Sequence, residues 1–171
     1  MEKEKLLEYV APCSLLCYAC PSFKTGPVSE CARKLHNYWE GFCEFRSKHL
    51  PEESRDEWRS EFNAFDNTLQ FLGGASCPGC RNHPPSNKNG WGCLGGCIIP
   101  ACAKAHKVDF CAECNDFPCR EAKEFLDMQG DDSIKASWES ETRHLKEIGL
   151  EAYFEEKKDA SHYIRYKKQD S

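Results

Sequence analysis

The sequence lacks the apolar runs that mark membrane-spanning and exported proteins. No stretch approaches the roughly 18 apolar residues that a membrane-spanning helix needs. The first ten residues, Met1 to Val10, contain acidic side chains and no apolar run of signal-peptide length. We therefore expect a cytoplasmic protein that does not engage a membrane.

Positive charge and catalytic motifs are also scarce. The 23 Lys and Arg residues are outnumbered by 28 Asp and Glu residues, which gives a net charge of -5. A nucleic-acid binder usually carries a basic face, so we expect no nucleic-acid partner. The adjacent carboxylates Asp131 and Asp132 do not share a helix face, and the glycine pairs lack the strand-then-helix context of a phosphate loop. We therefore predict no catalytic residue and no cofactor site of these kinds, and we lean away from an enzyme.

Cysteine, by contrast, is abundant. The chain has 13 cysteines in 171 residues, although 30% of its residues are charged. In a reducing compartment, closely spaced cysteines indicate metal sites or redox thiols rather than disulfides, and an odd number fits full pairing poorly. Eleven of them lie in clusters, whereas Cys31 and Cys43 stand apart in a helical stretch. We expect these two to pack as small apolar side chains.

The spacings of the clustered cysteines are those of metal sites. The segment 10–23 carries Cys-x3-Cys-x2-Cys, and Cys-x2-Cys pairs begin at Cys77 and Cys111. A Cys-x2-Cys turn can aim both sulfurs at one point, while a distant pair completes a tetrahedron. The spacing from Cys77 to Cys97 is close to that of a zinc ribbon. We therefore predict zinc ligation by the clustered thiols. They are Cys13, Cys17, Cys20, Cys77, Cys80, Cys93, Cys97, Cys102, Cys111, Cys114 and Cys119.

The division of these thiols into sites stays open at this point. Eleven is not a multiple of four: two four-Cys sites leave three thiols over, and three sites need one further ligand. Cys43, His83 or His106 are the candidates for that ligand. We expect two or three Zn²⁺ ions, with the N-terminal triad taking a fourth ligand from the segment 75–119.

The apolar pattern predicts a mostly α fold. Apolar residues at spacings of three and four predict a helical hairpin over residues 27–72, with two aromatic stripes packed together as core. Residues 75–119 are rich in Gly, Pro, Asn and Cys and lack a long periodic segment. Helical periodicity returns over residues 118–156, and 157–171 form a polar tail. We predict one domain, residues 1–156, with helices around an irregular, metal-stabilised centre.

The order of the cysteines and their flanking residues resembles the DUF3795 family, small prokaryotic Cys-rich proteins of unknown function. The resemblance is carried by the run Ala11-Pro-Cys-Ser-Leu-Leu-Cys-Tyr-Ala-Cys-Pro, by the Cys77 pair, by Cys97-Ile-x2-Ala-Cys102-Ala, and by Phe110-Cys-Ala-Glu-Cys-Asn-Asp-Phe-Pro-Cys119. Residues 146–150 also look like its C-terminal helix. That family commonly has Cys-Gly-Leu-x-Cys near the N-terminus, whereas Ser14 replaces the glycine here. The resemblance implies metal binding and supplies no activity or substrate.

Three functions compete on this pattern. We favour a structural zinc module that presents a surface to a protein partner. An iron–sulfur electron-transfer protein uses the same thiolates, although separated Cys pairs suit tetrahedral zinc better. Cys-x3-Cys-x2-Cys is also the cluster spacing of radical-SAM enzymes, but the chain is too short for their usual barrel. A thiol redox or metal-handling protein is the third possibility, and neither Cys-x2-Cys pair has the βαβ context of a thioredoxin-like site.

Overall fold

A computed structural model of the chain describes residues 1–82, 96–128, 132–161 and 163. The predicted mostly α fold is confirmed, and the described ranges contain no strand, only two isolated β-bridges. In chain order the helices are α1 (Lys3–Tyr9), α2 (Pro27–Trp39), α3 (Phe42–Lys48), η1 (Glu52–Ser54), α4 (Arg55–Gly73), η2 (Cys80–Asn82), α5 (Ile99–His106), η3 (Cys111–Glu113), α6 (Arg120–Asp127), α7 (Asp132–Ile148) and α8 (Leu150–Lys157), where η marks a 3-10 helix.

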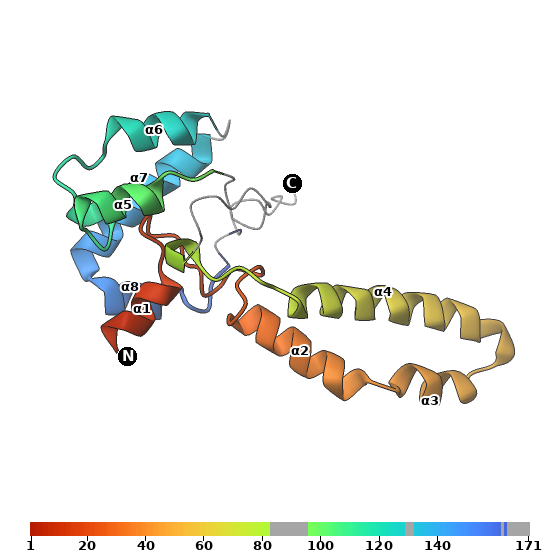
Figure 1. The fold of residues 1–171 in the computed structure, drawn as a ribbon. Coiled ribbons are helices and arrows are strands. Elements are labelled where there is room, and N and C mark those ends of the chain that lie inside the picture. The colour runs from red at the N-terminus through yellow and green to blue at the C-terminus, as the bar shows by residue number, and fades with distance from the viewer. Residues whose placement is uncertain (83–95, 129–131, 162, 164–171) are drawn as a thin grey trace.

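The helices α2, α3 and α4 form an arm that projects from a body built by the remaining helices (Figure 1). Pro27 occupies the first turn of α2, where its missing N–H costs nothing. The chain then breaks at Gly41, whose φ of 76° ends the helical path before α3. The predicted hairpin is therefore present, with its first half split into two helices at Gly41.

Aromatic side chains hold the arm together. The ring of Trp39 stacks on Phe62 with 5.6 Å between centroids, and it meets Phe65 edge-on at 5.8 Å. Such pairs stabilise by about 0.5–1.5 kcal/mol each beyond burial. Tyr38, however, is 85% exposed and Phe45 is 61% exposed. The expectation that both aromatic stripes are core is thus wrong in part, because no third layer of helices among the described residues covers the outer faces of the arm.

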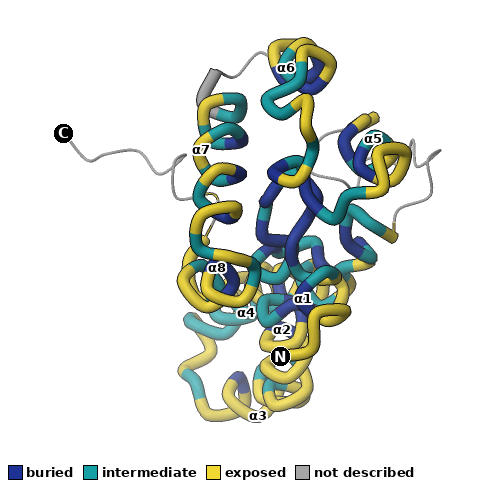
Figure 2. The backbone as a smooth tube through the Cα atoms, turned by 90° about the vertical axis from the view of Figure 1, so that its left-hand side faces the viewer, coloured by how far each residue is buried: buried dark blue, intermediate teal, exposed yellow. Residues whose placement is uncertain are grey.

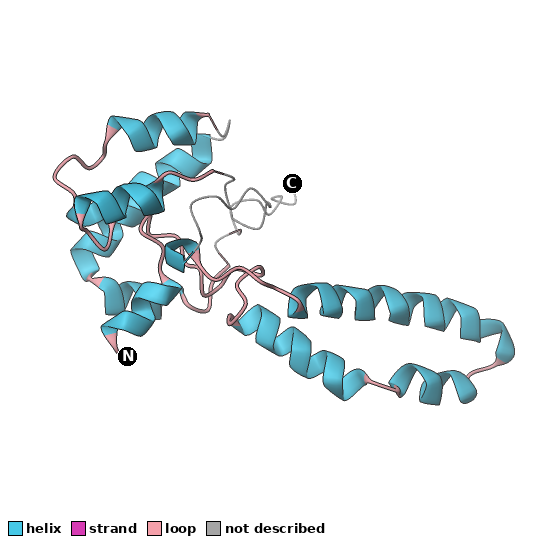
Figure 3. Cartoon of the chain, in the orientation of Figure 1, coloured by secondary structure: helices cyan, strands magenta, loops and turns pink. Residues whose placement is uncertain are grey.

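The body holds the apolar core (Figure 2). One cluster joins α1, α7 and α8 to the Cys-rich loops, with Phe154 at its centre, and the ring of Tyr9 stacks on Phe154 at 5.6 Å. A second cluster lies between α5, α6 and α7 and includes Phe125 and Trp138. Loop segments run between these helices (Figure 3), and of the cysteines that they carry Cys17, Cys20 and Cys77 are buried and the other described ones are half-buried.

Two of the helices were not expected. α1 has seven residues and α5 has eight, which is too short for a 3.6-residue period to repeat clearly. α5 lies within the segment that we expected to be irregular, and it ends where Lys107 adopts a left-handed φ of 56°. No helix within the described part of the chain is both long enough and apolar enough to span a membrane.

Candidate metal centre

The N-terminal cysteines lie on tight turns inside the body. The backbone N–H of Ala11 donates to the carbonyl of Leu15 at 2.8 Å, and that of Cys20 donates to Cys17 at 2.9 Å. These bonds fold the segment so that Cys17 and Cys20 are 5% and 6% exposed. Both pack in one cluster with Phe23, which Cys13 borders.

The Cys77 pair docks against this N-terminal segment. The N–H of Cys77 donates to the carbonyl of Ser22, and the N–H of Lys24 donates to the carbonyl of Cys77, both at 3.0 Å. Gly79 turns the chain with a φ of 86°, which leaves Cys80 beside the cluster of Cys17 and Cys20. Two distant Cys motifs therefore meet, as the sequence led us to expect.

Cys97 completes what we call the inner thiol group. Burial raises the pKa of the Cys13 thiol well above its usual range, and the nearby thiols of Cys97, Cys17 and Cys111 raise it further. Several thiolates this close repel one another unless a cation lies between them. The described members of the inner thiol group are Cys13, Cys17, Cys20, Cys77, Cys80 and Cys97.

Arg81 supplies a fixed positive charge beside the inner thiol group. Its guanidinium donates to the carbonyls of Leu7 at 2.8 Å and Asp109 at 2.6 Å, and it lies 4.8 Å above the ring of Phe110. Burial lowers the pKa of Arg81, whereas Asp109 and the thiols of the inner group raise it. The cation thus offsets the negative charge that thiolates bring to this region.

A second set of thiols surrounds a small cavity, which we call the outer pocket. Its volume is about 20 Å³, room for one atom-sized occupant, and its other walls include Ala103, Val108 and Phe117. Each thiol comes from a different point of the chain: α5, the two ends of η3, and the residue that precedes α6. The four thiols are Cys102, Cys111, Cys114 and Cys119.

The turn that carries Cys111 and Cys114 is fixed by local hydrogen bonds. The carboxylate of Glu113 accepts from the backbone N–H groups of Asp109 at 2.7 Å and Phe110 at 3.3 Å. The N–H of Cys114 donates to the carbonyl of Cys111 at 3.1 Å. These bonds place both sulfurs on the side of the turn that lines the pocket.

The electrostatics of the outer pocket suit a bound cation. The pKa of Cys111 is raised to about 12, chiefly by burial and also by the other three thiols, against the opposing effect of the Trp138 indole N–H. The Trp138 side chain is 5% exposed, and within the described ranges its Nε1 makes no full hydrogen bond, although it lies close enough to the Cys111 thiol to lower the pKa of that thiol. A buried donor that is not fully satisfied is costly. A metal-bound Cys111 thiolate is a stronger acceptor for this N–H than a neutral thiol is, so the pocket fits a thiolate-ligated metal.

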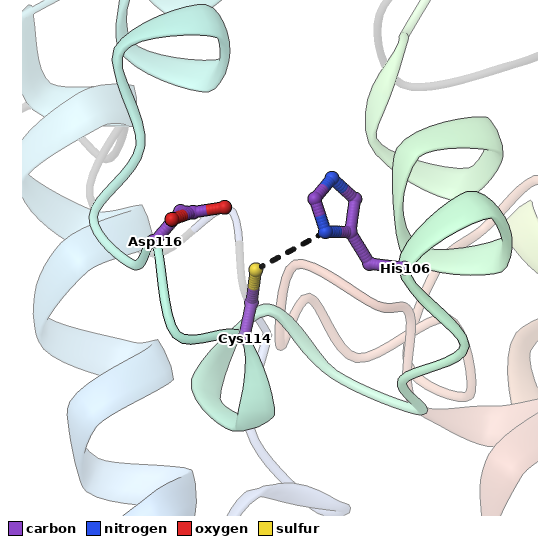
Figure 4. Close-up of side chains that lie close together, drawn as sticks. All are labelled: His106, Cys114 and Asp116. Carbon is purple, nitrogen blue, oxygen red and sulfur yellow. Dashed lines mark hydrogen bonds between the residues drawn. The ribbon is translucent and has the colours of Figure 1, made fainter.

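Two further ligand types lie at the rim of the outer pocket (Figure 4). The Nδ1 atom of His106 lies 3.8 Å from the Sγ atom of Cys114. One ligand atom from each of His106, Cys114 and Asp116 falls within 4.8 Å of the other two. His106 and Asp116 are exposed, whereas Cys114 is half-buried.

Of the comparisons with known proteins, the one with protein-family models finds a match. A family model described as a protein of unknown function, DUF3795, matches residues 9–124. The chain belongs to the DUF3795 family. The matched range contains both sets of thiols and ends within α6. No curated protein and no solved structure matches the chain.

Four other residues that the sequence of this DUF3795 protein singled out belong to neither set of described thiols. Cys93 and His83 are outside the described residues. Cys31 is exposed on α2, so its expected packing in a core is wrong: α2 turns Ser29 and Ala32 inward instead. Cys43 is half-buried on α3, at the far end of the arm from both sets of thiols (Figure 1). It is therefore not the additional ligand that three sites would need.

The serine that replaces the usual DUF3795 glycine has a structural explanation. Ser14 has a φ of 66°, in the left-handed region that favours glycine, and it is 1% exposed. Its hydroxyl donates to Thr142 Oγ1 at 3.1 Å, and the hydroxyl of Tyr153 donates to its carbonyl at 2.8 Å. The N-terminal Cys segment of this protein is thereby tied to α7 and α8.

Sequence reasoning missed three side chains of the candidate metal centre. Arg81 and Asp116 stand next to clustered cysteines, at Cys80 and within the stretch after Cys114, so their charge beside a Cys motif was a usable signal. Trp138 carried no such signal, because an aromatic residue on an amphipathic helix is expected in an apolar core. Only the packing of α7 against the outer pocket brings its indole to Cys111.

Proposed function

We propose that this DUF3795 protein is a structural zinc module in which thiolate-bound ions hold the Cys-rich loops against the helices of the body. The outer pocket carries the proposal: four thiols from α5, η3 and the start of α6 surround a cavity sized for one ion. A zinc site closed by four thiolates leaves no open position for a substrate and contributes directly to folding. The ligands are Cys102, Cys111, Cys114 and Cys119.

The inner thiol group holds the rest of the metal in this proposal. Its six described thiols suffice for one four-thiolate site, or for two ions that share thiolates, so we expect two or three tightly bound Zn²⁺ ions per chain. Arg81 favours the arrangement, because its charge compensates the excess negative charge of several thiolates around a divalent ion.

Zinc suits the outer pocket better than an iron–sulfur cluster does. Thiolates alone do not discriminate, since both metals accept them. A cluster of several iron and sulfide ions, however, needs far more room than a cavity of about 20 Å³. The inner thiol group is the place where a cluster would be accommodated if the zinc proposal failed.

We further propose that the arm presents the surface that a protein partner recognises. Its aromatic side chains remain accessible on a rigid helical pair, with Tyr38 at 85%, Phe45 at 61% and Phe65 at 43% exposure. Exposed aromatic residues are enriched in protein interfaces. Replacing Tyr38 and Phe45 by serine is expected to leave zinc content and the melting temperature unchanged while weakening a cross-linked partner complex; an unaltered complex would refute the role of the arm.

Matched cysteine variants test the zinc proposal. Cys102→Ser removes a proposed ligand of the outer pocket, and Cys31→Ser makes the same atomic change on the exposed face of the arm. We expect the first variant to lose one zinc equivalent per chain after desalting and the second to keep all of it. The unfolding free energy of Cys31→Ser should change by less than about 0.5 kcal/mol, as exposed sites do. Equal metal loss in both variants would contradict the assignment.

A further inference from the structure

The outer pocket has more potential ligands around it than one tetrahedral ion uses. Besides the four thiols, His106 lines the same cavity, and an oxygen of Asp116 lies within 4.8 Å of the Cys114 sulfur. His106 is the last residue of α5, and Asp116 lies in the loop between η3 and α6. Both side chains are exposed and lie close to Cys114 (Figure 4).

The spacing of His106 and Cys114 is that of two ligands to a common ion, and Asp116 lies near both. A nitrogen about 2.0–2.1 Å and a sulfur about 2.3 Å from the same zinc lie roughly 3.6 Å apart at a tetrahedral angle. The Nδ1 atom of His106 and the Sγ atom of Cys114 are 3.8 Å apart, and an oxygen of Asp116 is within 4.8 Å of both. Imidazole, thiolate and carboxylate are all established zinc ligands.

We propose that His106, Cys114 and Asp116 form a second, weaker cation subsite at the rim of the outer pocket, and that it takes a divalent transition-metal ion such as Zn²⁺. Three protein ligands leave a fourth position to water, as in an open zinc site. The proposal rests on the proposed function in one respect: the ion at the rim shares Cys114 with the zinc held in the pocket.

A shared thiolate gives the pocket a route for exchanging its metal. An ion bound at the rim already contacts Cys114, so thiolates can pass from the resident ion to the incoming one while the pocket remains occupied. Exchange by this route speeds up as free zinc fills the rim subsite and levels off once the subsite is full. Loss of the resident ion to solvent, by contrast, proceeds at a rate that free zinc does not change.

Isotope exchange on the zinc-loaded protein separates these two routes. Protein carrying natural-abundance zinc is mixed with isotopically enriched Zn²⁺ at several free concentrations, desalted at intervals, and analysed by mass spectrometry of the metal. For the wild type we expect one zinc equivalent whose exchange rate rises with free zinc and then saturates. For His106→Ala and Asp116→Asn we expect that fraction to exchange roughly tenfold more slowly, the scale on which metal-site neighbours act, with no dependence on free zinc.

Two variants on the arm serve as matched controls. His49 packs against Phe45 on the arm, and Asp56 is a fully exposed carboxylate of α4. His49→Ala and Asp56→Asn should exchange like the wild type. Zinc content after desalting and the melting temperature are measured for every protein, so that exchange is compared between folded, equally loaded samples.

Each other outcome counts against a specific claim. Wild-type exchange kinetics in His106→Ala and Asp116→Asn, with full zinc content, would overturn the rim subsite and leave the proposed function standing. Loss of tightly bound zinc in either variant would also overturn it, because that residue would then be a structural ligand of the pocket itself. A wild-type protein that retains no zinc after desalting would overturn the proposed function, and the shared subsite with it.

Discussion

At the scale of single residues, Ser14 shows how one side chain offsets the strain of its own backbone. A left-handed φ costs a residue other than glycine about 1–2 kcal/mol. The hydrogen bond from Ser14 to the buried Thr142, which is 0% exposed, compensates part of that cost. A net contribution near 1 kcal/mol is typical of such a bond. The free-energy cost of the strained φ and the stabilisation from the hydrogen bond are thus of similar size.

The balance between the strained φ and the hydrogen bond of Ser14 predicts different outcomes for two small substitutions at this position. Ser14→Ala keeps the strained φ and leaves the Thr142 hydroxyl without its donor, so we expect it to lower the unfolding free energy by about 1–3 kcal/mol. Ser14→Gly also loses the bond but relieves the strain, and it should stay within about 1 kcal/mol of the wild type. Denaturant unfolding of zinc-loaded protein measures both. Equal destabilisation by alanine and glycine would mean that the backbone at Ser14 carries no strain.

Arg81 is a cation close enough to the inner thiol group that the thiols of Cys13 and Cys17 act on its pKa. We expect Arg81→Leu to weaken zinc binding at this group roughly tenfold, as loss of a neighbour that tunes a metal site does, because its thiolates lose a compensating cation. Arg81→Lys keeps the positive charge and should recover most of the affinity. Competition with a chromophoric chelator measures both variants. If lysine and leucine weaken binding equally, the hydrogen bonds of Arg81 to Leu7 and Asp109 matter more than its charge.

At the scale of elements, the long helices were predictable and the short ones were not. α2 and α4 follow from the apolar period between Pro27 and Gly73, and the start of α8 follows from Gly149. α1 and α5 are too short to repeat a helical period, and they are stabilised by packing against α8 and against Phe125 and its neighbours. Tertiary contacts that no local pattern encodes therefore decide where these helices form.

The candidate site was predictable in its ligand types and not in its grouping. The cysteine spacings pointed to metal ligation, but the division of the thiols depends on contacts between distant segments. The hydrogen bonds of Cys77 with Ser22 and Lys24 bring one pair to the N-terminal segment. The outer pocket depends on α5, η3 and α6 converging. Neither of these sets of contacts can be predicted from the spacing of the cysteines along the sequence.

Metal removal is expected to affect these elements unequally. The segment 75–119 offers few apolar side chains against an ordering cost of about 1–2 kcal/mol per residue. In the proposed function it depends on zinc, which returns on the order of 10 kcal/mol per site. The arm depends on Trp39 and its aromatic neighbours instead. Strong chelation should therefore reduce the near-ultraviolet dichroism to the part contributed by the arm and expose the loops to protease, while part of the helix signal persists. An unchanged near-ultraviolet spectrum after verified metal removal would contradict this dependence.

At the scale of the whole molecule, the arm and the body differ in what they carry. The body holds the thiols, the buried Trp138 and the charge of Arg81 around its loops, whereas the arm projects from the body (Figure 1) and carries exposed aromatic side chains. In the proposed function the metal fixes the shape of the body, and the arm presents the surface that a protein partner recognises. The identity of the metal decides between this account and electron transfer, because zinc has no redox chemistry.

Metal analysis with a visible spectrum, on protein prepared without air from an iron-supplemented culture, tests this account most directly. We predict a colourless protein with two or three tightly bound zinc ions per chain, in keeping with closed tetrahedral thiolate sites. A brown protein with stoichiometric iron and sulfide, bleached by dithionite, would contradict the account and assign the inner thiol group to an iron–sulfur cluster.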